Sequence, residues 1–140
     1  MYYLKTEQDF DAAHFLKDYD GKCRNIHGHR WHVVAEIKGS QLSEEKQTRG
    51  MLVDFGDLKK SLKNICRIYD HSLIYEEGSL KEKTLEALRE ENFRLNGVNF
   101  RPTAENFAKQ FYDLLKKEGY DVFRVEVYET PKNCASYGEM

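Results

Sequence analysis

The chain has 140 residues, of which 40% are hydrophobic and 33% are charged, with 22 lysines and arginines against 24 aspartates and glutamates. This length suits one domain over residues 1–140, and the near-balance of charge gives no electrostatic reason to expect a nucleic acid or an anionic membrane as partner. No apolar run approaches the ~20 residues of a membrane span, the N-terminus lacks the pattern of a signal peptide, and three cysteines without close pairing indicate reduced thiols in the cytoplasm.

The predicted elements form groups of strands and helices. In chain order they are a strand within 2–15, a loop at 18–25, a strand at 27–39, a loop at 40–50, a short strand at 51–55, a helix at 58–69, a charge-rich segment at 75–101, a helix at 103–119 and a strand at 122–130. Aromatic and β-branched residues alternate with polar ones at 27–39, which is typical of a strand, whereas apolar residues at 58–69 recur on one helical face. Because the strands come in groups, the pattern predicts an α+β fold rather than a parallel βαβ sheet.

Capping signals mark two of these segments. Ser79 followed by Glu82 has the capping-box pattern and predicts a short surface helix in the charge-rich segment. Thr103, directly after Pro102, is the expected N-cap of the next helix, which ends at Gly119.

The strongest chemical signal is the pattern Cys23-x-x-x-His27-Gly28-His29. Side chains two positions apart on a strand point to the same side, so His27 and His29 can reach one metal ion, and Gly28 lets the backbone come close. Catalytic zinc takes three protein ligands, and His14 is the third candidate if the first two strands pair as a hairpin. Cys23 is either a fourth ligand of a closed structural site or a free nucleophile or base beside an open one, because a nearby dication would favour its thiolate.

Other polar residues stand out by position. His32 lies on the opposite face of its strand from the histidine pair, so we expect no metal there. Asp70 and His71 form either the end of a helix, where an imidazolium is favourable, or a proton-transfer pair. Glu129 continues the apolar parity of the last strand, where a carboxylate needs a partner such as the N–H edge of a ligand. Glu105 lies in a first helical turn, where the helix dipole already favours a negative charge.

Several motifs in order along nearly the whole chain support a family resemblance. They read FDAAHF, CRNIHGH, LVDFGDLK, YDHSLI, PTAENFA and VEVYET. Together they resemble the 6-pyruvoyl-tetrahydropterin synthase superfamily, and most closely its bacterial branch of 6-carboxy-5,6,7,8-tetrahydropterin synthases in queuosine biosynthesis. Residues 75–101 are the exception and are expected to be an insertion.

The resemblance implies a tunnelling fold, in which each subunit has a four-stranded antiparallel sheet with two helices on one face. Subunits of that fold close into a barrel, and a homohexamer with active sites between subunits is expected. The resemblance further implies zinc ligation by His14, His27 and His29, proton transfer by Cys23, Asp70 and His71, and pterin binding by Glu129, Glu105 and Thr103. Cys23 as a thiolate base implies an open zinc site.

The implied reaction is that of a zinc-dependent lyase. It converts 7,8-dihydroneopterin triphosphate to 6-carboxy-5,6,7,8-tetrahydropterin and releases triphosphate and acetaldehyde. The cysteine-to-histidine spacing resembles the carboxy branch, and Cys23 speaks against a third branch that has a glutamate in its place. The alternatives are 6-pyruvoyl-tetrahydropterin synthase activity on the same substrate, a non-catalytic zinc-binding module, and a three-histidine zinc hydrolase, for which the thiol would be unnecessary.

Overall fold

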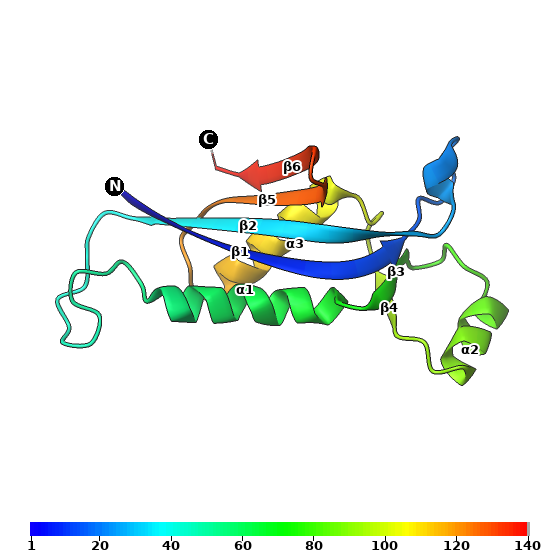
Figure 1. Ribbon diagram of the computed structural model, residues 1–140, viewed down its shortest axis with the longest axis horizontal. Helices are drawn as coiled ribbons and strands as arrows, with labels where there is room; N and C mark the ends of the chain where they lie inside the picture. Colours follow the sequence, from blue (N-terminus) through cyan, green and yellow to red (C-terminus); the bar gives the residue numbers. More distant parts are fainter. Residues whose placement is uncertain (140) are drawn as a thin grey trace.

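The computed structural model describes residues 1–139, which form three α-helices and a curled, mixed six-stranded sheet (Figure 1). Along the chain the elements are β1 (Tyr2–His14), the short 3-10 helix η1 (Lys22–Arg24), β2 (His27–Gly39), α1 (Phe55–Tyr69), β3 (Ser72–Glu76), α2 (Glu82–Glu90), β4 (Leu95–Val98), α3 (Ala104–Lys117), β5 (Val122–Thr130) and β6 (Asn133–Gly138). Within the described residues, no helix combines the length and apolar character needed to cross a membrane.

A long hairpin of β1 and β2 forms the centre of the sheet. The two strands pair without interruption from Tyr2 opposite Gly39 to His14 opposite His27. This confirms the expected hairpin, and it places two of the candidate ligands directly across from each other. The strand at 122–130 is also confirmed as β5, which pairs antiparallel with β2.

The sheet differs from the expected four antiparallel strands. Its order is β4-β3-β1-β2-β5-β6, and β3 runs parallel to both β1 and β4. The parallel pairing arises because β2 returns along β1 and α1 takes the chain forward again, so β3 enters beside the last residues of β1 in the same direction (Figure 1). Neither β3, β4 nor β6 was predicted, since each has six residues or fewer and no alternating pattern long enough to identify it.

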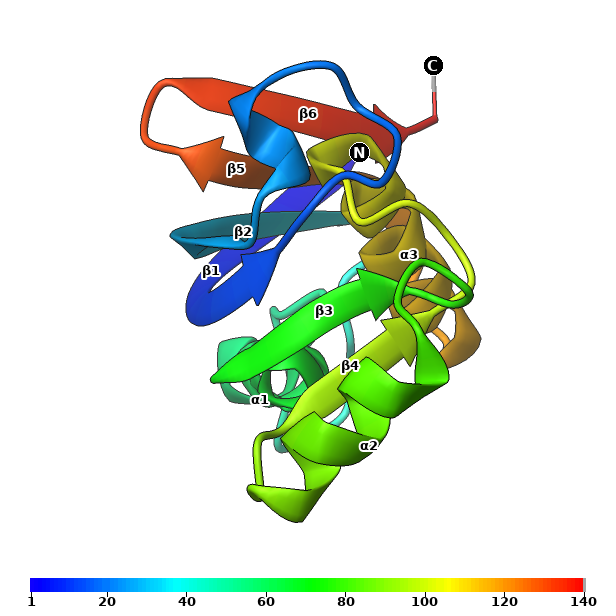
Figure 2. The ribbon, with the colours of Figure 1, turned by 90° about the vertical axis from the view of Figure 1, so that its right-hand side faces the viewer.

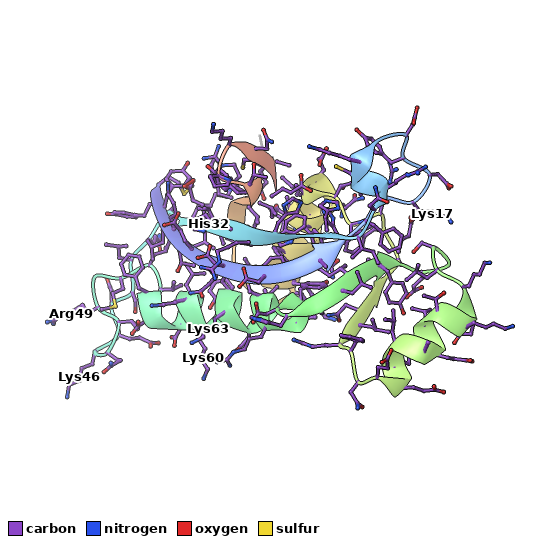
Figure 3. All side chains as sticks on the ribbon, turned by 45° about the vertical axis from the view of Figure 1, so that its right-hand side comes forward. Lys17, His32, Lys46, Arg49, Lys60 and Lys63 are labelled. Carbon is purple, nitrogen blue, oxygen red and sulfur yellow. The ribbon has the colours of Figure 1, made fainter. Side chains whose placement is uncertain are left out.

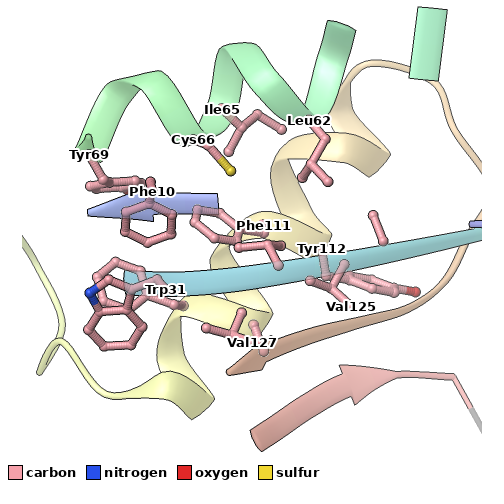
Figure 4. Close-up of a cluster of buried hydrophobic side chains, with 14 of the residues drawn as sticks. Phe10, Trp31, Leu62, Ile65, Cys66, Tyr69, Phe111, Tyr112, Val125 and Val127 are labelled. Atoms are coloured by element: carbon pink, nitrogen blue, oxygen red, sulfur yellow. The ribbon is translucent and has the colours of Figure 1, made fainter. Parts of the chain in front are cut away.

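The two predicted helices, α1 and α3, pack on one face of the sheet and bury the main core, as expected. Phe10 and Trp31 are partners in the hairpin and stack with ring centroids 5.8 Å apart, and Phe107, Phe111 and Tyr69 of the helices close over Phe10 (Figure 4). Each fully buried aromatic of this kind contributes about 1.5–3 kcal/mol through loss of apolar surface from water. The core therefore anchors the same strand ends that carry the histidines.

The opposite face of the β1–β2 hairpin is polar. His32 donates to Asp9 Oδ1 at 2.6 Å and to Glu7 Oε1 at 3.0 Å, and Figure 3 shows it on the side away from α1. Burial alone would lower the pKa of His32, but the hydrogen bonds to the two carboxylates outweigh burial and raise it. The expectation that His32 faces away from the other histidines is thus confirmed.

A second, smaller core lies between α2 and the β3–β4 pair. Leu85 of α2 packs there with Tyr75 and Phe15, and Figure 2 shows α2 against β4 at the open end of the sheet. Ile74, the neighbour of Tyr75, points instead into the main core. Because successive strand residues point to opposite faces, α2 covers the face of β3 and β4 that α1 and α3 leave free.

Two local predictions are wrong. Residues 51–55 are not a strand, because the Met51 carbonyl accepts from the Ser43 N–H at 2.8 Å within its own loop and Asp54 caps α1 by accepting from the Gly56 N–H. Ser79 does not cap α2, whose N-cap position is Lys81, although the predicted short helix itself is present. By contrast, Thr103 caps α3 as expected and accepts from the Asn106 N–H at 3.2 Å.

Candidate functional site

Three histidine rings meet at the end of the β1–β2 hairpin. His14 ends β1, and His27 and His29 begin β2, with ring centroids 4.6–5.2 Å apart. Trp31 lies beneath them, with its ring centroid 4.9 Å from that of His14, and its indole N–H donates to the Ala12 carbonyl at 3.2 Å. Within residues 1–139 the Nε2 atoms of all three histidines are buried and have no hydrogen-bond partner.

Backbone carbonyls fix the protonation of two of these rings. His14 Nδ1 lies 2.7 Å from the Pro102 carbonyl, and His27 Nδ1 lies 2.7 Å from the Asn25 carbonyl. A carbonyl only accepts, so each Nδ1 carries the hydrogen and each Nε2 presents a lone pair. Burial, helped by the neighbouring histidines and opposed by the Pro102 carbonyl, lowers the pKa of His14 to about 4, which keeps this ring neutral at pH 7.

Glu129, near the end of β5, completes the group. Its Oε1 lies 3.1 Å from His14 Nε2 and 3.4 Å from His29 Nε2. The contact with His14 is not a hydrogen bond, because a carboxylate and an unprotonated nitrogen are both acceptors. Burial lowers the pKa of His29, although Glu129 opposes this shift. We call His14, His27, His29 and Glu129 the histidine centre; its ligand atoms all lie within 4.8 Å of one another and can hold a metal ion.

The donor set suits zinc. Buried nitrogen lone pairs that face one another without a hydrogen donor repel, and a cation at their centre removes that repulsion. Three imidazoles with a carboxylate nearby are ligands that zinc commonly takes. In His14 and His27 the second ring nitrogen is bound by a backbone carbonyl, as is usual for metal-ligating histidines.

Cys23 lies outside this group. It belongs to η1, in the loop between β1 and β2, and its side chain is partly exposed. The loop is closed by the Leu16 N–H, which donates to the Cys23 carbonyl at 2.9 Å. Among residues 1–139, the histidine centre contains no thiol, so the described arrangement is not that of a closed site of three histidines and a cysteine.

Asp70 and His71 form a hydrogen-bonded pair at the end of α1. His71 Nδ1 lies 2.9 Å from Asp70 Oδ2, and Asp70 Oδ1 accepts from the Asp11 N–H at 2.9 Å. The Asp11 N–H lowers the pKa of Asp70, and His71 and Arg94 act in the same direction. His71 has a φ of 54°, in the left-handed region, and its N–H donates to the Asp11 carbonyl at 2.6 Å.

Two surface cavities border the histidine centre, and the larger of them also reaches His71 of this pair. One, of about 720 Å³, is lined by His29, Arg30 and His71, and the other, of about 540 Å³, by His29, Arg30 and Glu129. Gly28 also lines both cavities. A Cβ at Gly28 would meet only the Ala12 carbonyl, at 3.8 Å, so the expected close backbone approach is not what requires glycine there.

The remaining predicted residues lie farther along α3. Thr103 is joined to Pro102, whose carbonyl holds His14, while Glu105 is exposed in the first turn of α3. Neither lines the two cavities next to His29. Sequence reasoning missed Arg30, which lines both cavities and forms a two-point ion pair with Asp11 at 3.0 and 3.1 Å. The signal that could have found it is its position between His29 and Trp31 in the ligand strand.

Comparison with known proteins gives consistent results. Residues 3–140 match the family described as 6-pyruvoyl tetrahydropterin synthase. The chain is 35% identical over 142 residues to 6-carboxy-5,6,7,8-tetrahydropterin synthase of Haemophilus influenzae, with 99% of this chain and 100% of the relative covered. It is 33% identical over 139 residues to the protein of the same name in Aquifex aeolicus, with 91% and 83% covered.

Two solved structures share the fold. An uncharacterized protein of Wolinella succinogenes superposes with a TM-score of 0.80 at 22% identity, with 99% of this chain and 98% of that one covered. The 6-pyruvoyl tetrahydropterin synthase of Caenorhabditis elegans superposes with a TM-score of 0.69 at 23% identity, with 99% and 96% covered.

Proposed function

The chain belongs to the 6-pyruvoyl tetrahydropterin synthase family, and from this premise we propose that it is a zinc-dependent 6-carboxy-5,6,7,8-tetrahydropterin synthase. It acts on 7,8-dihydroneopterin triphosphate, releases triphosphate and acetaldehyde, and serves queuosine biosynthesis. The names of the relatives from Haemophilus influenzae and Aquifex aeolicus support the carboxy product.

One observation carries the proposal. Three buried imidazole nitrogens without a hydrogen-bond partner converge with the Glu129 carboxylate at the wall of an open cavity. Zinc, when bound there, supplies Lewis acidity that stabilises negative charge on substrate oxygens. A purely structural zinc site is closed by four protein ligands. In our proposal zinc takes only the three histidines of the group, and the Glu129 carboxylate binds the pterin, so that one zinc position stays open.

The roles that we propose for the other residues are those that the family resemblance implies. Cys23 and the Asp70–His71 pair move protons, and Asp70 holds the His71 ring by accepting from its Nδ1. Glu129 accepts hydrogen bonds from the N–H edge of the pterin, with Thr103 and Glu105 as further pterin contacts.

The assembly is part of the proposal. We infer a homohexamer in which subunits close into barrels and active sites lie between them. β6 is exposed along most of its length at one edge of the sheet, and an unpaired edge can pair with another subunit. Analytical ultracentrifugation is expected to give six times the subunit mass, and a monomer with full activity would contradict this part.

The direct test is to incubate the zinc-loaded protein with 7,8-dihydroneopterin triphosphate and to identify the products by mass spectrometry with an acetaldehyde trap. Carboxy-tetrahydropterin with trapped acetaldehyde is the expected result. A pyruvoyl product without acetaldehyde would instead assign the activity that names the Caenorhabditis elegans protein. No conversion by a fully zinc-loaded oligomer would leave the non-catalytic zinc-binding module.

A further inference from the structure

The C-terminal end of α1 is capped by the side chains of Arg94, which directly precedes β4, and of Asn96 within β4. The guanidinium group of Arg94 donates to the carbonyls of Arg67 at 2.8 Å and Ile68 at 2.9 Å, and it also donates to the carbonyl of Asp70. The Asn96 amide donates to the Ile68 carbonyl at 2.8 Å. These are the last carbonyls of the helix, which have no partner within it. The cap is therefore built by residues at the start of β4 and directly before it, which lie more than 20 positions later in the sequence.

The capped end carries the Asp70–His71 pair. Arg94 binds the carbonyl of the peptide group that joins the two residues, so it restrains the plane of that peptide. His71 has a left-handed φ of 54°, which a residue with a side chain adopts only when its surroundings hold it there. Asp11 of β1 holds the pair from the other side, through the His71 N–H and the Asp70 carboxylate.

The position of Arg94 indicates how it acts. Arg94 and His71 line the same cavity of about 720 Å³, but Nη1 and Nη2 of the guanidinium group already donate to three carbonyls. A cation at this end of a helix also interacts favourably with the helix dipole. Arg94 is thus committed to the protein backbone rather than free to take an anionic substrate group.

We propose that Arg94, supported by Asn96, is a positioning residue that holds the Asp70–His71 pair in the orientation needed for proton transfer. Its kinetic consequence rests on the function proposed above, whereas its structural consequence does not. Segment 75–101, expected to be an insertion, would then contribute to the active site through β4 without touching the substrate.

The test compares Arg94→Met with Arg89→Met. Arg89 is a matched control because it lies on α2 and its side chain forms an exposed contact with Glu82 at 3.3 Å, far from the end of α1. Arg94→Met is expected to lower kcat about 10- to 100-fold, since a small misplacement of a reacting group costs about that much, with KM and zinc content unchanged. Arg89→Met is expected to leave all three values unchanged, and Arg94→Lys, which keeps donors at the helix end, is expected to recover part of kcat.

A second measurement does not depend on activity. Hydrogen exchange of the peptide that spans residues 66–75 is expected to be faster in Arg94→Met than in wild type and unchanged in Arg89→Met. A raised KM with unchanged kcat would show that Arg94 binds substrate and would overturn the proposal, as would an unaltered exchange rate. If the wild type fails to convert the pterin, the proposed function fails, and the exchange comparison still decides whether Arg94 holds the pair.

Discussion

The histidine centre and the Asp70–His71 pair lie beside neighbouring cavities, but they differ in whether their polar atoms have hydrogen-bond partners. In the centre, His14, His27 and His29 have buried Nε2 atoms that find no hydrogen-bond partner among the described residues. In the pair, the Asp70 carboxylate accepts from the Asp11 N–H and from His71, and it lies near the surface. The centre can thus hold a cation, whereas the carboxylate of the pair already has its hydrogen-bond partners within the chain.

This difference separates two kinds of contribution to the proposed reaction. A group of ligands that can hold a cation is tested by metal content, because loss of one ligand weakens metal binding. The Asp70–His71 pair, whose carboxylate already has hydrogen-bond partners, is tested by the turnover rate, because substituting either residue should leave the metal in place. The predictions below use that separation, and they begin with the largest effect.

The largest effect is expected for His27→Ala. Removing one of three imidazoles should take zinc content well below one ion per subunit and lower activity by on the order of 10³-fold or more, since the Lewis acid is worth several kcal/mol. Metal content is measured by plasma mass spectrometry after dialysis. His32→Ala is the matched control from the same strand, because His32 faces Asp9 and Glu7 on the opposite side, and it should retain its zinc.

The proton-transfer groups should behave differently. His71→Asn, which tolerates the left-handed backbone, and Cys23→Ala are each expected to lower kcat by about 10²- to 10⁴-fold with zinc fully retained. Parallel assays of turnover and metal content check this. Loss of zinc from Cys23→Ala would contradict the open site and would make the thiol a ligand.

The sequence predicts the histidine centre better than it predicts the pair. Strand parity and the loop at 18–25 suffice to bring His14 opposite His27, because hairpin pairing is local and regular. The contact of Asp70 with His71 depends on a single left-handed φ, which no residue pattern around His71 signals. For Asp70 and His71 the sequence therefore left two interpretations open, a helix end or a proton-transfer pair.

The wrong predictions about the fold concern segments whose structure is decided by contacts with residues far away in the sequence. Residues 51–55 were expected to be a short strand, yet residues 51–54 pair with no strand of the described sheet, and Asp54 is the N-cap of α1. The pairing of β3 with β1 and the reach of Arg94 to α1 connect segments that are 24 to 60 positions apart. Long-range choices of this kind are decided by packing and by unsatisfied backbone groups rather than by local propensity.

Glu129→Gln tests whether Glu129 is a metal ligand or a pterin-binding residue, because its carboxylate approaches both His14 and His29. If Glu129 binds the pterin edge, the neutral amide should weaken pterin affinity by about 10- to 100-fold, since hydrogen bonds to a charged group are worth about 1.5–3 kcal/mol. Zinc content should not change. Titration calorimetry with a pterin and the metal assay decide the matter together, and loss of zinc with unchanged pterin affinity would make Glu129 a ligand instead.

The smallest effect is expected for the stability of Asp70→Asn. The pKa of Asp70 is lowered by the Asp11 N–H, with His71 and Arg94 contributing, so its ionised form stabilises the fold. That stabilisation is present above the ordinary pKa of 3.8 and is lost as the pH falls through the lower value in the folded protein. Because the carboxylate is near the surface, solvent limits its worth to about 0.5 kcal/mol at pH 7.

Urea unfolding of wild type and Asp70→Asn at pH 7 and pH 3 checks this prediction. Asparagine can still accept from the Asp11 N–H, so the substitution removes the charge while keeping that hydrogen bond. The difference in the free energy of unfolding should narrow at pH 3, where the wild-type carboxyl begins to take up its proton. A difference that widened on acidification would mean that the fold raises the pKa of Asp70 and holds it protonated. The pair would then not be the charged, hydrogen-bonded pair that contrasts with the histidine centre.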